Sequence, residues 1–237
     1  MKPVIRWTIG LVSDFGFSSL KKSIESFRSI YKNEFDYFLC YNSLDKRHFD
    51  MISDLEVQMV EQKPCADMFD PLGVAWKLYP PRLRLCSHEL FIDNDLIILR
   101  RIKEIDDFLS SGNLFLYSES RLDRPYGEYE SEVASELKMN SGFFGIPPEF
   151  DFEKEIKKKM AESLHDKWVQ NFDEQGLVAS IFSSQKRLKK ISLNDIFICG
   201  PGLKKSEFLF GRNGYHFVKL NSGFSKYWDM YNRGRIF

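Results

Sequence analysis

The sequence has few cysteines and no excess of either charge. Cys40, Cys65, Cys86 and Cys199 form neither a CxxC pair nor a zinc-ligand spacing, so no disulfide or metal-thiolate framework is indicated. A reduced, cytoplasmic protein is therefore expected. Lys plus Arg equals Asp plus Glu at 34 each, which lacks the positive excess of a general nucleic-acid binder, and we expect no nucleic-acid partner.

Long hydrophobic runs are also missing. No window reaches the roughly 18 apolar residues of a membrane-spanning helix, and the apolar run near the N-terminus is short for a signal peptide. We therefore expect a soluble chain. The basic segments 154–160, 185–190 and 203–205 are typical of solvated helix faces and turns. Peripheral contact with an anionic membrane surface, or with phosphates, is the alternative.

Hydrophobic residues make up 43% of the 237 residues, enough for one sizeable core, and we expect a single domain over 1–237. Apolar runs of strand length alternate with segments of helical period in the first third, which predicts an α/β fold with a mostly parallel, Rossmann-like central sheet flanked by helices. A GxGxxG turn is lacking. The expected strands are 7–12, 36–42, 56–62, 88–100 and 113–120, and the expected helices are 17–31, 44–53 and 102–111.

Other segments carry weaker patterns. A helix within 66–86 should stop before Pro80, because the residue before a proline is displaced from the α region. Residues 121–130 have the turn formers and charges of a mobile loop. The remaining segments, 140–148, a basic helix near 151–166, 168–182 and 215–228, predict sheet additions and closing loops.

Two carboxylates stand close together in the segment FIDNDLIIL. On an extended backbone Asp93 and Asp95 would point to one side, and such a pair at the end of a core strand needs a compensating cation. Oxygen ligands favour Mg²⁺ or Mn²⁺. The same residue types also favour a surface turn, so the motif alone leaves both interpretations open.

Four segments follow one another in order: the DxD motif at 93–95, NSG at 140–142, DEQ at 173–175, and a C-terminal His216 followed by Gly223, Lys226 and Trp228. In this order they resemble the GT-A nucleotide-sugar glycosyltransferases, most closely the superfamily of glycosyltransferase family 8, across nearly the whole chain. The family pattern is His-x-x-Gly-x-x-Lys-Pro-Trp. Here the gap between His216 and Gly223 is longer, and Tyr227 replaces the proline.

The resemblance implies a role for each of these segments. Asp93, Asp95 and His216 would hold Mn²⁺ or Mg²⁺, and Lys226 with Gly223 would bind the diphosphate. The donor sugar would contact Asn140, Ser141 and Gly142, and the catalytic segment over donor and acceptor would be Asp173, Glu174 and Gln175. A capped helix start is a second interpretation of the DEQ segment.

The nucleotide is expected at the strand ends of the N-terminal half, about 1–100, and the donor sugar and acceptor in the half of about 101–237. The candidate nucleotide or phosphate contacts, each weighed against ordinary packing or surface roles, are Leu11, Val12, Ser13, Tyr41, Lys77, Arg82, Arg84 and Asn94.

The sequence therefore predicts a metal-dependent glycosyltransferase that moves a sugar from a nucleotide-sugar donor, by resemblance a UDP-sugar, to a hydroxyl of a glycan or lipid-linked saccharide. Retention of configuration is favoured over inversion, which would need Asp173 or Glu174 as a base. A haloacid-dehalogenase-type phosphohydrolase, whose first Asp of a DxD motif is the nucleophile, is the alternative enzyme. A non-catalytic sugar-binding relative is the other alternative.

Overall fold

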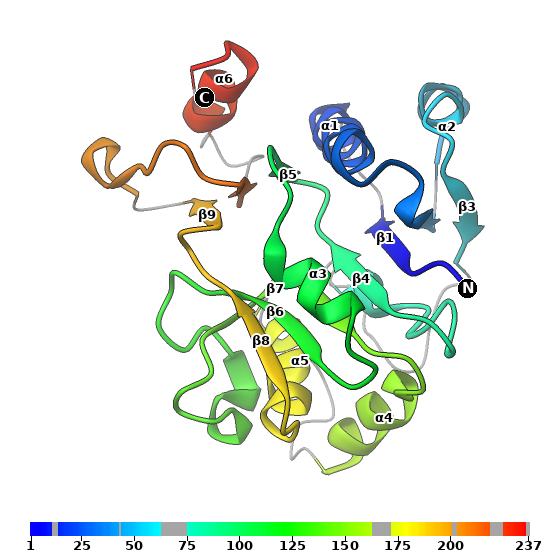
Figure 1. The fold of residues 1–237 in the computed structure, drawn as a ribbon, viewed down its shortest axis with the longest axis vertical. Helices are drawn as coiled ribbons and strands as arrows, with labels where there is room; N and C mark the ends of the chain where they lie inside the picture. Colours follow the sequence, from blue (N-terminus) through cyan, green and yellow to red (C-terminus); the bar gives the residue numbers. More distant parts are fainter. Residues whose placement is uncertain are drawn as a thin grey trace.

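The computed structural model describes residues 1–10, 14–42, 44–62, 75–162, 172–200, 203–218 and 225–235. A seven-stranded sheet forms the centre of the molecule, with helices on both sides (Figure 1). In spatial order its strands are β3 (Gln58–Glu61), β2 (Asp36–Tyr41), β1 (Val4–Ile9), β4 (Glu89–Ile92), β7 (Met139–Ile146), β6 (Phe115–Glu119) and β8 (Leu188–Ile191). Only β7 runs antiparallel to both of its neighbours, which confirms the predicted α/β class with a mixed, mostly parallel sheet.

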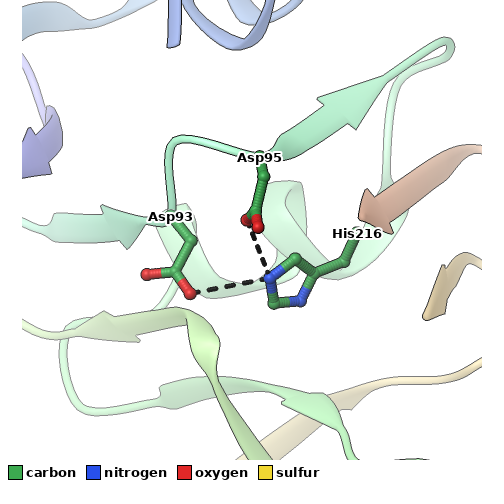
Figure 2. Close-up of side chains that lie close together, drawn as sticks. All are labelled: Asp93, Asp95 and His216. Carbon is green, nitrogen blue, oxygen red and sulfur yellow. Dashed lines mark ion pairs between the residues drawn. The ribbon is translucent and has the colours of Figure 1, made fainter. Parts of the chain in front are cut away.

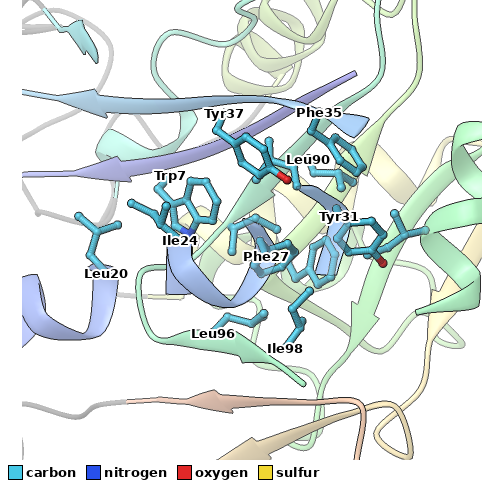
Figure 3. Close-up of a cluster of buried hydrophobic side chains, with 14 of the residues drawn as sticks. Trp7, Leu20, Ile24, Phe27, Tyr31, Phe35, Tyr37, Leu90, Leu96 and Ile98 are labelled. Atoms are coloured by element: carbon cyan, nitrogen blue, oxygen red, sulfur yellow. The ribbon is translucent and has the colours of Figure 1, made fainter. Parts of the chain in front are cut away.

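Alternating side chains divide the core between the two faces of this sheet. Leu90 and Ile92 of β4 belong to one hydrophobic cluster, and Phe91 between them belongs to the other, as the period of two in a strand requires. The first face packs on α1 (Asp14–Tyr31) and α3 (Lys103–Leu109), as Figure 3 shows for the aromatic side chains around Trp7. The second face packs on α4 (Phe152–Glu162) and α5 (Asp173–Ser183).

A second sheet of three strands lies beside the first. Its order is β5 (Leu96–Ile98), β10 (Gly214–Phe217), β9 (Ile196–Cys199). Buried serines of α1 connect the two sheets, since Ser23 Oγ accepts a hydrogen bond from Trp7 Nε1 at 2.9 Å and donates one to the Leu96 carbonyl at 2.5 Å. Helix α1 therefore holds β5 at a set position relative to β1.

The remaining elements are short. They are the 3₁₀ helices η1 (Lys32–Glu34), η2 (Ala75–Leu78), η3 (Gly127–Glu132) and η4 (Lys205–Glu207), and the helices α2 (Lys46–Ser53) and α6 (Ser225–Asn232). Of the helix expected before Pro80, only η2 is described, and 63–74 lie outside the described residues. Among the helices of the described residues, none combines the length and apolar character needed to cross a bilayer.

Three expectations about local structure were wrong. Segment 168–182 was expected among the sheet additions and closing loops, but its described part lies almost wholly in helix α5. Residues 88–100 do not form one strand, because a turn at 93–95 separates β4 from β5 and sends them into different sheets. Residues 121–130 are not wholly a mobile loop, since Tyr126 and Tyr129 are buried against α5 in the second core cluster. Burial of two aromatic rings outweighs the turn-forming composition of this segment. Strands β4 and β7 pair across the proposed boundary near residue 100, so both halves belong to one sheet. The division into a nucleotide half and an acceptor half stays a prediction.

Candidate metal and sugar site

The aspartate motif forms one of the connections between the two sheets. Asp93 directly follows β4, and its amide donates to the Gly142 carbonyl of β7 at 2.8 Å. Asp95 directly precedes β5, and its carbonyl accepts from the Phe217 amide of β10 at 2.9 Å. The backbone turns here, with the Leu96 amide 3.3 Å from the Asp93 carbonyl. The motif is thus a turn, as one sequence interpretation held, but each end is tied to a different sheet.

His216 comes to this turn through strand pairing. In the antiparallel pairing of β5 with β10, His216 lies opposite Leu96, next to Asp95. Its Nε2 is 3.1 Å from Asp95 Oδ1 and 3.5 Å from Asp93 Oδ2, and Figure 2 shows both carboxylates converging on that one ring nitrogen. One ligand atom from each of the three residues lies within 4.8 Å of the other two. The structure therefore brings together all three predicted metal ligands.

Gly142 leaves the space in which these groups meet. A Cβ atom on Gly142 would lie 2.1 Å from His216 Cε1 and 2.8 Å from Asp93 Oδ2. Carbon atoms in proteins do not approach so closely, so any side chain at this position would displace the imidazole or the carboxylate. The glycine of the NSG segment thus shapes the metal-ligand cluster as well as lining the cavity described below.

The charges of the cluster shift its pKa values strongly. Burial alone would lower the pKa of His216, but the negative charges of Asp95 and Asp93 raise it to about 9. Burial would raise the pKa of Asp93, but Lys77 and His216 lower it to about 2. Asp95 Oδ1 accepts no hydrogen bond from the described residues, although the imidazole is near. Two carboxylates and an imidazole, with a buried oxygen left over, are a donor set that suits Mn²⁺ or Mg²⁺.

A lysine and a glutamate lie next to the cluster. Lys77 Nζ, from η2, is 3.2 Å from Asp93 Oδ1 and 3.1 Å from Glu174 Oε2, and it donates to Ser141 Oγ at 3.2 Å. Burial raises the pKa of Glu174 to about 7, with Lys77 opposing that shift, and the two carboxylates raise the pKa of Lys77. Lys77 thus joins the aspartate motif to the DEQ segment by charge.

The NSG and DEQ segments meet directly. Gln175 Oε1 accepts hydrogen bonds from Asn140 Nδ2 at 3.3 Å and from the Ser141 amide at 3.1 Å. Asp173 points elsewhere, because its carboxylate accepts from the Glu128 amide at 2.9 Å. Asp173 is also not the cap of α5, since Phe172 occupies that position and the helix begins at Asp173.

One cavity of about 420 Å³ is lined by most of the predicted site residues that the structure describes. Its lining includes the predicted residues Lys77, Asp93, Asp95, Asn140, Ser141, Gly142, Glu174, Gln175 and His216. Such a volume suits a small-molecule ligand, and cavities of this kind are the usual location of binding sites. Residues as far apart in the sequence as Lys77 and His216 therefore surround one space.

Other predicted residues do not line this cavity. Arg82 lies 3.5 Å from Glu89 and donates to backbone carbonyls, and Arg84 pairs with Asp36. Tyr41 packs against the first core cluster, and Asn94 Nδ2 donates to the Gly16 carbonyl at 3.3 Å. Leu11, Val12, Ser13 and Gly223 lie outside the described residues, as does the side chain of Lys226 on α6.

Sequence reasoning missed several residues of the cavity wall. They are Ser120, Arg121, Leu122, Phe172, Ile198, Gly200 and Val218. Residues 120–122 directly follow β6, and the carboxyl ends of strands are where open α/β sheets bind ligands, so this position was a usable signal. Phe172 stands immediately before the DEQ segment, but nothing in the pattern separates it from an ordinary core phenylalanine.

Comparison with known proteins gives matches among solved structures only. No protein-family profile and no curated protein matches the chain. The galactosyltransferase LgtC, solved with donor and acceptor sugar analogues, superposes with a TM-score of 0.68 at 11% identity, over 97% of this chain and 95% of that one. The bifunctional glycosyltransferase WbbM matches with a TM-score of 0.66 at 15% identity, over 99% of this chain and 51% of that one.

A third match has more modest similarity. A glycosyltransferase involved in the glycosylation of the major capsid of PBCV-1 has a TM-score of 0.54 at 11% identity, over 96% of this chain and 99% of that one. At such low identities the likeness concerns the fold. The chain has the fold of the GT-A glycosyltransferases.

Proposed function

We propose that this protein is a metal-dependent glycosyltransferase that moves a sugar from a nucleotide-sugar donor, a UDP-sugar by the sequence resemblance, to a hydroxyl group of a saccharide acceptor. One observation carries the proposal. The cavity that is lined by Asp93, Asp95 and His216 is also lined by the NSG and DEQ segments, so a cation site and sugar-binding groups share one space. The fold supports transfer over the phosphohydrolase alternative.

Mn²⁺ or Mg²⁺ would be held by Asp93, Asp95 and His216. When bound, the ion supplies a Lewis acid that offsets the negative charge developing on a departing diphosphate. The raised pKa of His216 fits a cation site, because Asp93 and Asp95 attract positive charge to this position. Without a metal ion, a proton on the imidazole supplies that charge.

The chain's own groups would bind and orient the donor sugar. Asn140, Ser141 and Gln175 present amide and hydroxyl groups to the cavity, and their mutual hydrogen bonds hold them in place. Lys77 contacts the carboxylates of Asp93 and Glu174 beside them. Lys226 with Gly223 for the diphosphate, and Leu11 to Ser13 with Tyr41 for the nucleoside, complete the proposed donor site.

Retention of configuration is the stereochemical outcome we propose. Inversion needs a carboxylate that is free to take the proton of the acceptor. Asp173 is engaged with the Glu128 amide, which leaves Glu174, whose Oε2 is paired with Lys77, as the base that inversion would use. The preference for retention therefore rests on the sequence resemblance. The anomeric configuration of the first product, observed by NMR during the reaction, tests this point.

A thermal-shift panel of nucleotide sugars with Mn²⁺, with and without EDTA, tests the function. At least one donor should raise the melting temperature only when the metal is present. Asp95→Asn should abolish this response, and Asp54→Asn, at an exposed aspartate of the same chain, is the matched control. The proposal fails if no donor gives a metal-dependent shift. Release of phosphate from simple phosphoesters would instead support the phosphohydrolase.

A further inference from the structure

Part of the cavity wall is apolar and lies outside the residues proposed to hold the metal or the donor sugar. Phe172 and Leu122 line the cavity, yet 39% and 49% of their surfaces stay exposed. Ile198 and Val218 contribute further apolar lining. Exposed apolar groups that border a binding cavity mark a contact surface for a ligand.

Phe172 stands immediately before α5 and leaves its ring partly exposed. Its backbone is already helical, with φ −90° and ψ −7°, and it makes no side-chain hydrogen bond to the helix amides. The ring lines the cavity although 39% of the residue surface is exposed. A large aromatic ring that stays partly exposed at a cavity is available to contact a ligand.

Both side chains are carried on anchored backbone. Ser120 Oγ hydrogen-bonds to the Leu122 amide at 3.2 Å and to its carbonyl at 3.1 Å, which closes the turn after β6. The Phe172 carbonyl accepts from the Gly176 amide at 2.8 Å, in the first turn of α5. A surface that is already in place loses little conformational freedom when it binds a ligand.

We propose that Phe172 and Leu122 form a shelf that binds the acceptor saccharide by the C–H face of a pyranose ring. This inference rests on the proposed function and names where the acceptor binds. A pyranose has an apolar face and a rim of hydroxyl groups. Polar side chains next to the shelf in sequence suit the hydroxyl rim. Arg121 precedes Leu122 and Glu174 closely follows Phe172, and both line the cavity, where they can hydrogen-bond to hydroxyl groups. An alkyl chain would bury such polar groups without hydrogen bonds.

Saturation-transfer NMR with methyl β-D-glucopyranoside, methyl β-D-galactopyranoside and methyl N-acetyl-β-D-glucosaminide tests the shelf, in the presence and absence of UDP and Mn²⁺. At least one glycoside should receive saturation at its ring C–H protons. Phe172→Ala should weaken this signal at least about fivefold, because the ring face loses its apolar contact. Phe172→Tyr should retain it.

Phe49→Ala is the matched control, because Phe49 is a phenylalanine of α2 that is 45% exposed and does not line the cavity. Its signal should equal that of the wild type. Equal saturation in Phe172→Ala and wild type would overturn the proposal, as would binding of octyl glycosides through the alkyl chain alone, or no saturation of any pyranoside. The measurement without UDP and Mn²⁺ reports on the shelf alone, so a failure of metal-dependent donor binding is seen separately in the thermal-shift panel.

Discussion

Gly142 lies where the sheets bring His216 and Asp93 together, and its lack of a side chain is essential to the cluster. Gly142→Ala places a Cβ where the imidazole ring lies. We expect the affinity for Mn²⁺ to fall by at least about tenfold, since a ligand moved off its position loses more than about 1.4 kcal/mol of binding free energy. Titration of the protein with Mn²⁺, followed by calorimetry, measures this.

Gly112→Ala is the control for that substitution. A Cβ on Gly112 would meet no atom within 4 Å, so this variant should bind Mn²⁺ like the wild type. Equal affinities in both alanine variants would show that the room left by Gly142 does not matter for the metal.

Glu174 should make the stability of the protein depend on pH. Its pKa rises from 4.5 to about 7 on folding, because burial disfavours the ionised form. The folded state therefore holds this proton more tightly than the unfolded state. The resulting stability is fully present below pH 4.5 and is lost as the pH rises through about 7.

Glu174→Gln removes this dependence. We expect the free energy of unfolding of the variant, relative to wild type, to increase from pH 5 to pH 8, by on the order of 3 kcal/mol at most. Urea unfolding at both pH values in EDTA measures the difference. A constant difference between the two proteins across this range would refute the assignment.

Segment 79–89, which joins η2 to β4, depends on a buried group of charges. Glu89 is fully buried, and Arg6 Nη1 and Arg82 Nε lie 3.2 and 3.5 Å from its carboxylate. Arg6 also donates to the Tyr79 carbonyl at 2.8 Å, close to Lys77 along the chain. The two arginines of β1 and of this segment thus support the position of Lys77 at the site.

Glu89→Gln should destabilise the protein by about 3–5 kcal/mol, because two guanidinium groups would lose their buried counter-charge. Glu34→Gln is the matched control, since Glu34 and its partner Arg101 are each 46% exposed, and the expected cost is below about 1 kcal/mol. Chemical denaturation of both variants gives the two values. Similar losses would mean that burial of the Glu89 network contributes little.

The 3₁₀ helix η3 is attached to α5 by close contact. A Cβ on Gly176 would lie 2.0 Å from the Tyr126 carbonyl, and Gln175 Nε2 donates to the Pro125 carbonyl at 2.9 Å. The missing side chain of Gly176 and the hydrogen bond from Gln175 therefore allow η3 to pack closely on α5. Composition alone indicated a mobile segment because these contacts come from residues about 50 positions away.

The two sheets meet at the candidate metal site, so a bound cation would connect them. Asp93 follows β4 of the larger sheet, whereas His216 belongs to β10 of the smaller one. Binding to the folded state alone stabilises what the ligand joins. We expect Mn²⁺ to slow amide hydrogen exchange in residues 93–96 and 214–217 together, and to leave β3 unchanged. Hydrogen exchange followed by mass spectrometry measures these rates, with Asp95→Asn as the control. Slower exchange in only one of the two segments would contradict a metal ion held by both sheets.

Local pattern was sufficient for the parts of the molecule that depend on neighbours in sequence. The period of α1, the apolar runs of β1, β2 and β4, and the acids after β4 all follow from side chains within one segment, and the predicted fold class is confirmed. The same reasoning placed 88–100 in a single strand, because an apolar run on each side of an acidic turn has the pattern of one buried strand.

The amino-acid sequence by itself determined the types of most elements and the chemistry of the acidic motif, since both are properties of adjacent residues. Only the tertiary structure decided which distant groups meet. Pairing of β10 with β5 brings His216 to Asp95, Glu89 draws Arg82 away from the cavity that Lys77 lines, and packing of η3 on α5 sets the cavity wall that contains Phe172. Each of these contacts depends on strand register and on the pairing of buried charges, which are set by the whole fold.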